Sequence, residues 1–133
     1  MKQNSYLLDT HALLFWVNQS EVSGNFIKHF DNQQQKGNVA VSAISFWEIA
    51  LLVKKKRIKI GDVQNWKNEL FNNTNLRLIN IDVSEMITST TLPDFHKDPF
   101  DRLLIAQAKL HKTLLVTKDK QIQKYDVQTF WME

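Results

Sequence analysis

The sequence predicts an α/β fold with a parallel sheet whose two faces are both covered by helices. Short apolar runs with strand character alternate with longer runs in which apolar residues recur at helical spacing. The chain has only 3 Gly and 2 Pro in 133 residues, and neither a linker nor an internal repeat interrupts the alternation. This pattern is typical of parallel strands connected by helices. A length of 133 residues suits one domain, and we expect residues 1–133 to form it.

Strands and helices alternate through the first half of the chain. Residues 5–9 (SYLLD) predict a buried strand, and the run HALLFWV after them has helical character. Residues 23–37 predict a moderately amphipathic helix that ends at Gly37. The strand expected over 38–42 is followed by a helix over 45–57, with apolar residues at helical spacing.

The second half continues the alternation, with elements bounded by capping residues and proline. In chain order we expect a helix capped by Asp62 and ending at Phe71, a strand over 76–81, a short helix from Ser84 closed by Pro93, a helix from Asp98 to about His111, and strands over 113–117 and 126–131. The predicted sheet therefore has five strands.

Composition excludes several classes of protein. The chain has no cysteine, so it has neither a disulfide framework nor a thiolate metal site. Its start, MKQNSYLLDT, is too short and too polar for a signal peptide, and no run approaches the roughly 20 apolar residues of a membrane span. We therefore expect a cytoplasmic protein without a membrane partner. The formal net charge of +3 does not by itself indicate a polyanionic partner.

Four acidic residues follow strands or begin helices in equivalent places. Asp9 follows the first strand, and Asp119 follows the strand over 113–117. Glu48 and Asp101 lie on what we expect to be the first turns of their helices. In open parallel sheets, binding sites form beyond the carboxyl ends of the strands. We therefore expect the four carboxylates to lie near one edge of the sheet.

Each acid also has a structural explanation at a helix start. Asp9 and Asp119 can accept hydrogen bonds from the free N–H groups of the helical segments that follow them. Residues 45–48 fit the capping box S-x-x-E. Asp98 followed by Pro99 fits an N-cap with proline at the first helical position. Capping explains any one acid, but it does not require four of them to converge.

A convergence of carboxylates indicates a hard cation. Negative charges close together repel one another unless a cation lies among them. A set of Asp and Glu without Cys or a histidine pair is typical of sites for Mg²⁺ or Mn²⁺. The four histidines lack the spacing of metal ligands, although His11 and His96 lie near the expected site and can contact a substrate. Ions of this kind keep bound waters, and such a water can attack a phosphodiester.

The sequence resembles the PIN-domain nucleases, and among them the VapC-type toxins of bacterial toxin–antitoxin pairs. The resemblance rests on four segments in matching order and spacing: YLLDTHALLFW (6–16), VSAISFWEIALLVKKKRI (41–58), HKDPFDRLLIAQA (96–108) and LLVTKD (114–119). It implies a single-domain, three-layer α/β/α sandwich with a parallel sheet and a metal-dependent endoribonuclease activity. It also implies that Mg²⁺ or Mn²⁺ is bound by the four motif acids, Asp9, Glu48, Asp101 and Asp119.

The resemblance also implies supporting residues and partners. Thr10 and Thr117 match the small hydroxyl residues that the family often has near its site. RNA is the implied substrate, a cognate antitoxin protein the implied partner, and a homodimer the implied assembly. An apolar patch on which an antitoxin segment docks is expected on the flanking helices, formed by Phe15, Trp16, Phe46 and Trp47.

Helical geometry separates Asp98 from Asp101. Asp101 shares one helix face with three apolar residues that must turn inward, Leu104, Ile105 and Ala108. Asp101 therefore projects from the top of a buried stripe toward the sheet edge, whereas Asp98 lies outside the first turn and supports the site as a cap. Arg102 can contact a phosphate or pair with Asp98, and we expect the ion pair.

The basic run KKKR ends the helix that carries Glu48. Cations are favourable at a helix C-terminus, so the run has a structural explanation. Its functional explanation is a patch that contacts RNA phosphates or an acidic partner, formed by Lys54, Lys55, Lys56 and Arg57.

Three rival functions remain open on the sequence. A PIN nuclease outside a toxin–antitoxin pair would process RNA with the same acids. A phosphohydrolase would use Asp9 as a covalent nucleophile, although Thr10-His11 lacks the second aspartate that such enzymes usually carry two residues on. A non-catalytic module would bind RNA or accept a phosphoryl group, but it does not explain why Glu48 and Asp101 occur together.

Overall fold

The computed structural model describes residues 4–133, so the first three residues of the stretch MKQNSYLLDT lie outside the described residues. Five parallel strands form one sheet in the order β3-β2-β1-β4-β5. This confirms the predicted parallel sheet. The strands are β1 (Tyr6–Leu8), β2 (Val39–Ser42), β3 (Arg77–Ile79), β4 (Leu114–Val116) and β5 (Thr129–Phe130).

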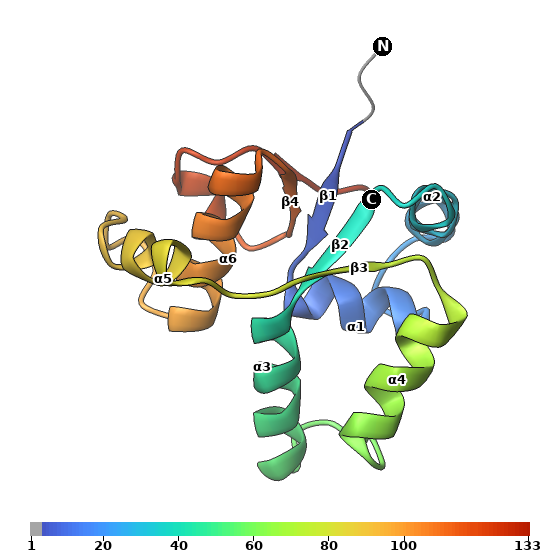
Figure 1. Ribbon diagram of the computed structural model, residues 1–133. Helices are drawn as coiled ribbons and strands as arrows, with labels where there is room; N and C mark the ends of the chain where they lie inside the picture. The colour runs from blue at the N-terminus through green and yellow to red at the C-terminus, as the bar shows by residue number, and fades with distance from the viewer. Residues whose placement is uncertain (1–3) are drawn as a thin grey trace.

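Helices connect the strands and lie on both sides of the sheet (Figure 1). Each helix longer than one turn coincides with a region that the sequence predicts to be helical. No helix within residues 4–133 is long and apolar enough to cross a membrane. The helices are α1 (Thr10–Asn18), α2 (Gly24–Gln35), α3 (Ala43–Lys54), α4 (Val63–Asn73), α5 (Val83–Thr90), α6 (Pro99–His111) and the 3-10 turn η1 (Ile122–Lys124).

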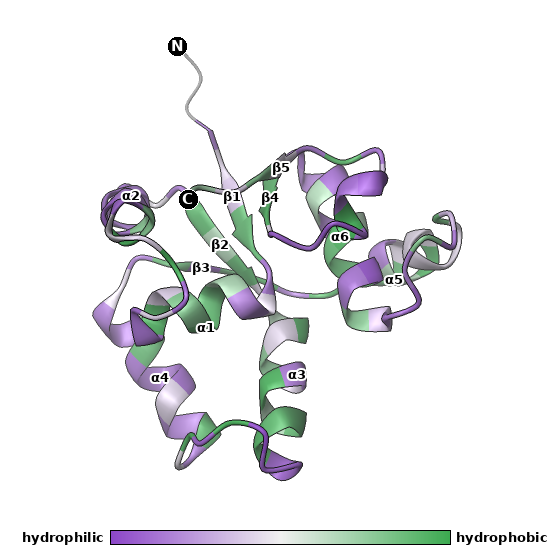
Figure 2. Ribbon diagram, turned by 180° about the vertical axis from the view of Figure 1, so that it is seen from behind, coloured by the Kyte–Doolittle hydropathy of each residue, from purple (hydrophilic) through white to green (hydrophobic). Residues whose placement is uncertain are grey.

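Side chains of the central strands alternate between two hydrophobic cores. Tyr6 and Leu8 of β1 pack in one core with Leu13 of α1. Leu7 lies between them in sequence and packs in the other core with Leu104 of α6. The sheet is therefore buried on both faces, in three layers, and Figure 2 shows the apolar character of β1, β2 and β4 that this burial requires.

Helix α3 begins two residues earlier than predicted. Ser42 is its N-cap, because Ser42 Oγ accepts a hydrogen bond from the Ile44 N–H at 3.1 Å. The capping box predicted from Ser45 to Glu48 is therefore wrong. Glu48 is the sixth helical residue, so its predicted place on the first turn is also wrong: it lies on the second turn of α3.

Helix α5 also begins before its predicted cap. Asp82 and Glu85 form a capping box around its first turn, so Val83 is the first helical residue and the assignment of Ser84 as the start is wrong. The predicted cap of α4 is confirmed: Asp62 Oδ1 accepts from the Asn65 N–H at 3.0 Å at the start of that helix. Local capping chemistry thus sets where these helices start.

Candidate metal centre at the carboxyl edge of the sheet

Two of the four acids follow neighbouring strands. Asp9 comes directly after β1 and caps α1, with Oδ1 accepting from the Ala12 N–H at 2.7 Å. Asp119 lies three residues after β4, and its Oδ1 accepts from the Gln121 N–H at 2.7 Å. Because β1 and β4 are adjacent and parallel, both acids lie at the same edge of the sheet. Asp9 therefore combines a capping role with a place at this edge, whereas the N-cap of the turn η1 after Asp119 is Gln121.

Asp101 is the third residue of α6 and lies among the other acids. Burial raises the pKa of Asp101 to about 8, and the negative charges of Asp98, Asp9, Glu48 and Asp119 add to the rise. The structure thus brings the other three predicted acids, Asp9, Glu48 and Asp119, within electrostatic reach of Asp101. The apolar face expected below Asp101 is buried as predicted.

Asp9 is buried and is held by two hydrogen-bond donors. Burial raises its pKa, while hydrogen bonds from the Thr117 side chain and the Ala12 N–H oppose that rise. Thr117 Oγ1 also accepts from the Asp119 N–H at 3.1 Å. The predicted supporting hydroxyl at Thr117 therefore contacts both acids that follow the central strands.

Glu48 reaches the site from α3. Its Oε1 is buried and has no hydrogen-bond partner among residues 4–133. Thr10, the other predicted hydroxyl residue, donates from Oγ1 to the Ser45 Oγ at 2.9 Å, and this buried bond links the starts of α1 and α3. A buried carboxylate oxygen without a donor is costly unless a cation or water meets it.

His96 also reaches into the acid cluster, although no sequence pattern singled it out as a ligand. Its Nε2 lies 2.9 Å from Asp101 Oδ2 and 3.2 Å from Asp119 Oδ2. One ligand atom from each of these residues lies within 4.8 Å of the others, a spacing that can hold a metal ion. The contact with Asp119 joins positions 23 residues apart, so no local spacing predicts it.

A main-chain hydrogen bond determines which nitrogen of His96 carries the proton. The Asp98 N–H donates to Nδ1 at 3.1 Å, so the proton of a neutral imidazole lies on Nε2. In this arrangement Nε2–H donates to the carboxylates of Asp101 and Asp119 and offers no lone pair to a cation.

Asp98 caps α6 as predicted, with Oδ1 accepting from the Phe100 N–H at 2.9 Å. The predicted ion pair between Asp98 and Arg102 is wrong, because the acidic partner of Arg102 is Asp94 at 3.5 Å. The guanidinium donates at 2.9 to 3.0 Å to four main-chain oxygens, those of Ser89, Leu92, Pro93 and His96. Arg102 therefore anchors the loop that carries His96.

The remaining residues predicted to lie on the surface differ in how exposed they are. Lys54 is the last residue of α3 and Lys55 is its C-cap, and all four side chains of the KKKR run are exposed. The predicted four-residue apolar patch is wrong, because Trp16 is buried and its indole N–H donates to Asp31 Oδ1 at 2.9 Å. Trp47, by contrast, is 60% exposed.

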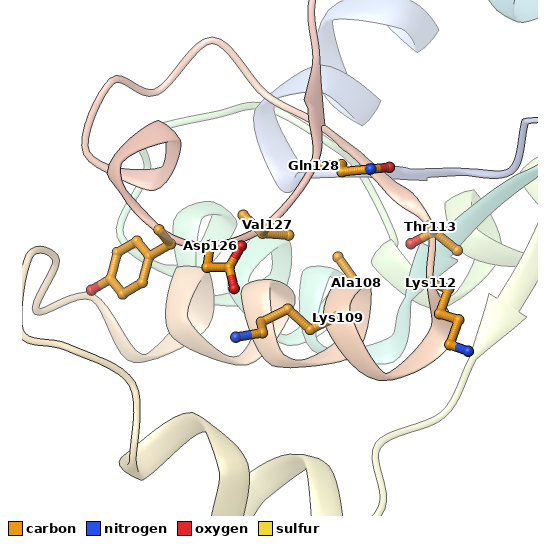
Figure 3. Close-up of a pocket in the computed structure, with 8 residues that line it drawn as sticks. Ala108, Lys109, Lys112, Thr113, Asp126, Val127 and Gln128 are labelled. Atoms are coloured by element: carbon orange, nitrogen blue, oxygen red, sulfur yellow. The ribbon is translucent and has the colours of Figure 1, made fainter.

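A separate hollow lies along the end of α6. It has a volume of about 470 Å³ and lies between α6 and the segment that precedes β5 (Figure 3). Lys109 on α6 and Asp126 on that segment line its two walls (Figure 3). None of the four acids lines this hollow, so it is not part of the acid cluster.

Family models and known proteins agree with this architecture. The model of the PIN domain matches residues 6–128. The chain belongs to the PIN-domain family. Ribonuclease VapC22 of Mycobacterium tuberculosis is 34% identical to this PIN domain over 125 residues, which are 90% of each chain. Residues 6–128, which the family model matches, include all four acids, and the resemblance inferred from four sequence segments is confirmed.

Solved structures show the same fold. VapBC2 of Rickettsia felis, in a crystal structure with a fragment of promoter DNA, matches this PIN domain with a TM-score of 0.73 and 17% identity, covering 96% of this chain and 98% of that chain. A toxin–antitoxin complex from Klebsiella pneumoniae matches with a TM-score of 0.60 and 23% identity, covering 87% and 88%. These likenesses confirm the predicted α/β fold with a parallel sheet.

Proposed function

We propose that this PIN domain is a metal-dependent endoribonuclease that hydrolyses RNA phosphodiesters. The observation that carries the proposal is the convergence of Asp9, Glu48, Asp101 and Asp119 at one edge of the sheet, where burial and mutual repulsion raise the pKa of Asp101 to about 8. The 34% identity to a protein named as a ribonuclease supports RNA as the substrate.

The acid cluster fits Mg²⁺ or Mn²⁺. Its donors are carboxylate oxygens, which these ions prefer. Among residues 4–133, Glu48 Oε1 has no hydrogen-bond partner, and burial raises the pKa values of Asp9 and Asp101, so a cation at this place would offset the cost of these carboxylates. An ion held there by the four acids, directly or through water, supplies an acidified water and offsets charge on the phosphate.

The chain's own residues hold these acids in place. Thr117 bonds to Asp9 and to the main chain of Asp119, and so keeps two carboxylates together. Thr10 bonds to Ser45 and so fixes the start of the helix that carries Glu48. These second contacts orient the carboxylates before a substrate arrives, which lowers the cost of reaching the reactive geometry.

The substrate that suits this site is single-stranded or loop RNA. Its backbone can bend into an acidic site, whereas a duplex cannot. The proposed role is that of a cytoplasmic toxin in a type II toxin–antitoxin system. The toxin would act as a homodimer and would be bound by a cognate antitoxin. The toxin–antitoxin complex from Klebsiella pneumoniae, which shares the fold, supports the antitoxin partner.

The test is cleavage of a labelled single-stranded RNA by the purified chain with Mg²⁺. We expect cleavage that EDTA stops and that Asp101→Asn removes, whereas Asp98→Asn, which preserves a capping side chain, remains active. Activity unchanged by EDTA or by Asp101→Asn would contradict the metal–carboxylate mechanism. Binding of RNA without cleavage, with both Mg²⁺ and Mn²⁺, would favour a non-catalytic scaffold.

A further inference from the structure

A groove lies beside the acid cluster, between the second half of α3 and the start of α6. Its volume is about 530 Å³. Glu48, one of the four acids, lines one part of it, and Lys55 and Arg57 line the part farther along the α3 side. Lys97 and Phe100 line the side nearer α6. The groove therefore connects the acid cluster with a set of basic side chains.

Three cations of the groove are free to meet an anionic ligand. Lys55, Arg57 and Lys97 are exposed, and none of them forms an ion pair within residues 4–133. Two acids also line the groove, but both already make other interactions. Asp98 caps α6, and Glu48 belongs to the acid cluster. The unpaired side chains of Lys55, Arg57 and Lys97 therefore give the groove a positive charge that is complementary to phosphates.

An aromatic pair borders the groove, with Phe100 lining the groove itself and Trp47 lining a neighbouring hollow. Phe100 packs edge-to-face against Trp47, with ring centroids 5.3 Å apart and an interplanar angle of 74°. Trp47 is 60% exposed, although an indole of this size is costly to leave in water. An exposed aromatic ring beside a cationic groove, here that of Trp47, is the usual platform on which single-stranded bases stack.

We propose that this groove binds the single strand of RNA on one side of the scissile phosphate. Lys55, Arg57 and Lys97 contact its phosphates, and a base stacks on the Trp47–Phe100 pair. The proposal rests on the ribonuclease function, because a strand laid in the groove reaches Glu48 and thus the acid cluster. Stacking and phosphate contacts tolerate any base, so the groove supplies affinity with little sequence preference.

The first test measures RNA affinity against salt. The full chain carrying Asp101→Asn keeps the RNA uncut, and a short fluorescein-labelled single-stranded RNA reports binding by anisotropy. Changing Lys55, Arg57 and Lys97 together to alanine is expected to weaken binding at least about tenfold at low salt. The slope of log K against log salt should flatten by about 2, since each phosphate contact contributes about 0.7.

The matched control removes the same charge elsewhere. Lys36, Lys109 and Lys112 are exposed and lie outside the groove, the last two on the hollow of Figure 3. Changing these three to alanine should alter affinity by no more than roughly twofold, because their effect is only long-range. Equal losses for the two triple variants would overturn the groove, since net charge alone would then explain binding.

The second test addresses the aromatic pair. Trp47→Ala should weaken binding about tenfold without changing the salt slope, and Trp47→Phe should recover most of the loss. Light scattering on the same variants identifies the competing explanation. A change in molecular mass with unchanged RNA affinity would show that Trp47 contacts another protein chain, and it would overturn the stacking role.

Failure of the groove and failure of the ribonuclease function give different results. If the wild-type chain cuts RNA while the Lys55, Arg57 and Lys97 variant binds it as tightly as its parent, the groove proposal is overturned and the activity stands. If the wild-type chain cuts no RNA with Mg²⁺ or Mn²⁺, the activity fails. If RNA does not bind the Asp101→Asn chain at all, the groove fails as well.

Discussion

The acid cluster lies at the start of α6 and the buried acid Glu85 lies near its end, and the two differ in the groups that surround them. At its start, Asp101 lies among like charges, and its pKa is raised to about 8. Near its end, Glu85 is only 2% exposed, yet three donors meet it. These are the Asp82 N–H at 3.1 Å, Gln107 Nε2 at 3.1 Å and His111 Nε2 at 2.7 Å.

This difference shows that burial alone does not mark a functional acid. Both oxygens of Glu85 have donors, so its burial stabilises the contact between α5 and α6. In the acid cluster, Glu48 Oε1 has no partner among the described residues, and the charge on Asp101 is opposed by its neighbours. A buried acid with too few donors is the one that requires a cation.

The largest expected effect comes from neutralising the centre of the cluster. Asp101→Asn should reduce RNA cleavage by at least about 100-fold, because several kcal/mol of charge stabilisation by a metal ion are lost. The same change removes repulsion, so it should raise the thermal midpoint of the protein in EDTA. Cleavage assays and thermal melts measure the two effects. A variant that is both active and less stable would contradict the comparison.

Removing the satisfied acid should have the opposite profile. Glu85→Ala should lower the free energy of unfolding by about 3 kcal/mol, because buried partners lose a charged acceptor and α5 loses its capping box. Cleavage per folded molecule should remain near wild type. Urea unfolding and activity at low temperature measure these quantities, and a selective loss of activity would place Glu85 in the site.

The stability of the metal-free protein should fall as pH rises. Between about pH 4 and 8 the unfolded chain has released the proton that folded Asp101 still holds, because the folded pKa is about 8 and the ordinary value is 3.8. The unfolded state thus binds fewer protons, and each pH unit costs up to about 1.4 kcal/mol. Asp9 acts in the same direction.

Urea unfolding in EDTA across this pH range measures the slope, with Asp101→Asn as the control that should flatten it. Adding Mg²⁺ should also reduce the slope, since a cation favours the ionised carboxylates. Stability that instead rises with pH over this interval would show that Asp101 is already ionised in the folded protein.

His96 offers a smaller effect within the cluster. His96→Ala removes the N–H between Asp101 and Asp119, so the protein in EDTA should lose about 1 kcal/mol of stability. Addition of Mg²⁺ should then raise the thermal midpoint more than it does in the wild type. An equal or smaller rise would mean that the His96 side chain does not compete with Mg²⁺ for the carboxylates of Asp101 and Asp119.

The smallest effect is expected at the neighbouring cap. Asp98→Asn keeps an oxygen that accepts from the Phe100 N–H. The thermal midpoint should therefore change less in this variant than in His96→Ala. Activity should stay close to wild type. Asp98→Ala is the matched variant, because it removes the cap and should cost about 1 kcal/mol.

The sequence by itself determined the fold class and the separation of the two aspartates in α6. Alternating strand and helix patterns persist in the structure because the covalent order of the elements dictates a parallel sheet. Asp98 and Asp101 were distinguished because capping and helical spacing act over two or three residues. Contacts between residues so close in sequence can be predicted from the local sequence alone.

Only the tertiary structure decided how the cluster is completed. The approach of His96 to Asp119, the four carbonyls bound by Arg102 and the pairing of Trp47 with Phe100 each join different elements. Such contacts depend on how α3 and α6 pack against the sheet, and packing responds to the whole core rather than to neighbours in sequence. Spacing along the chain therefore predicts which residues reach the edge of the sheet, and the packed core selects the partners they meet there.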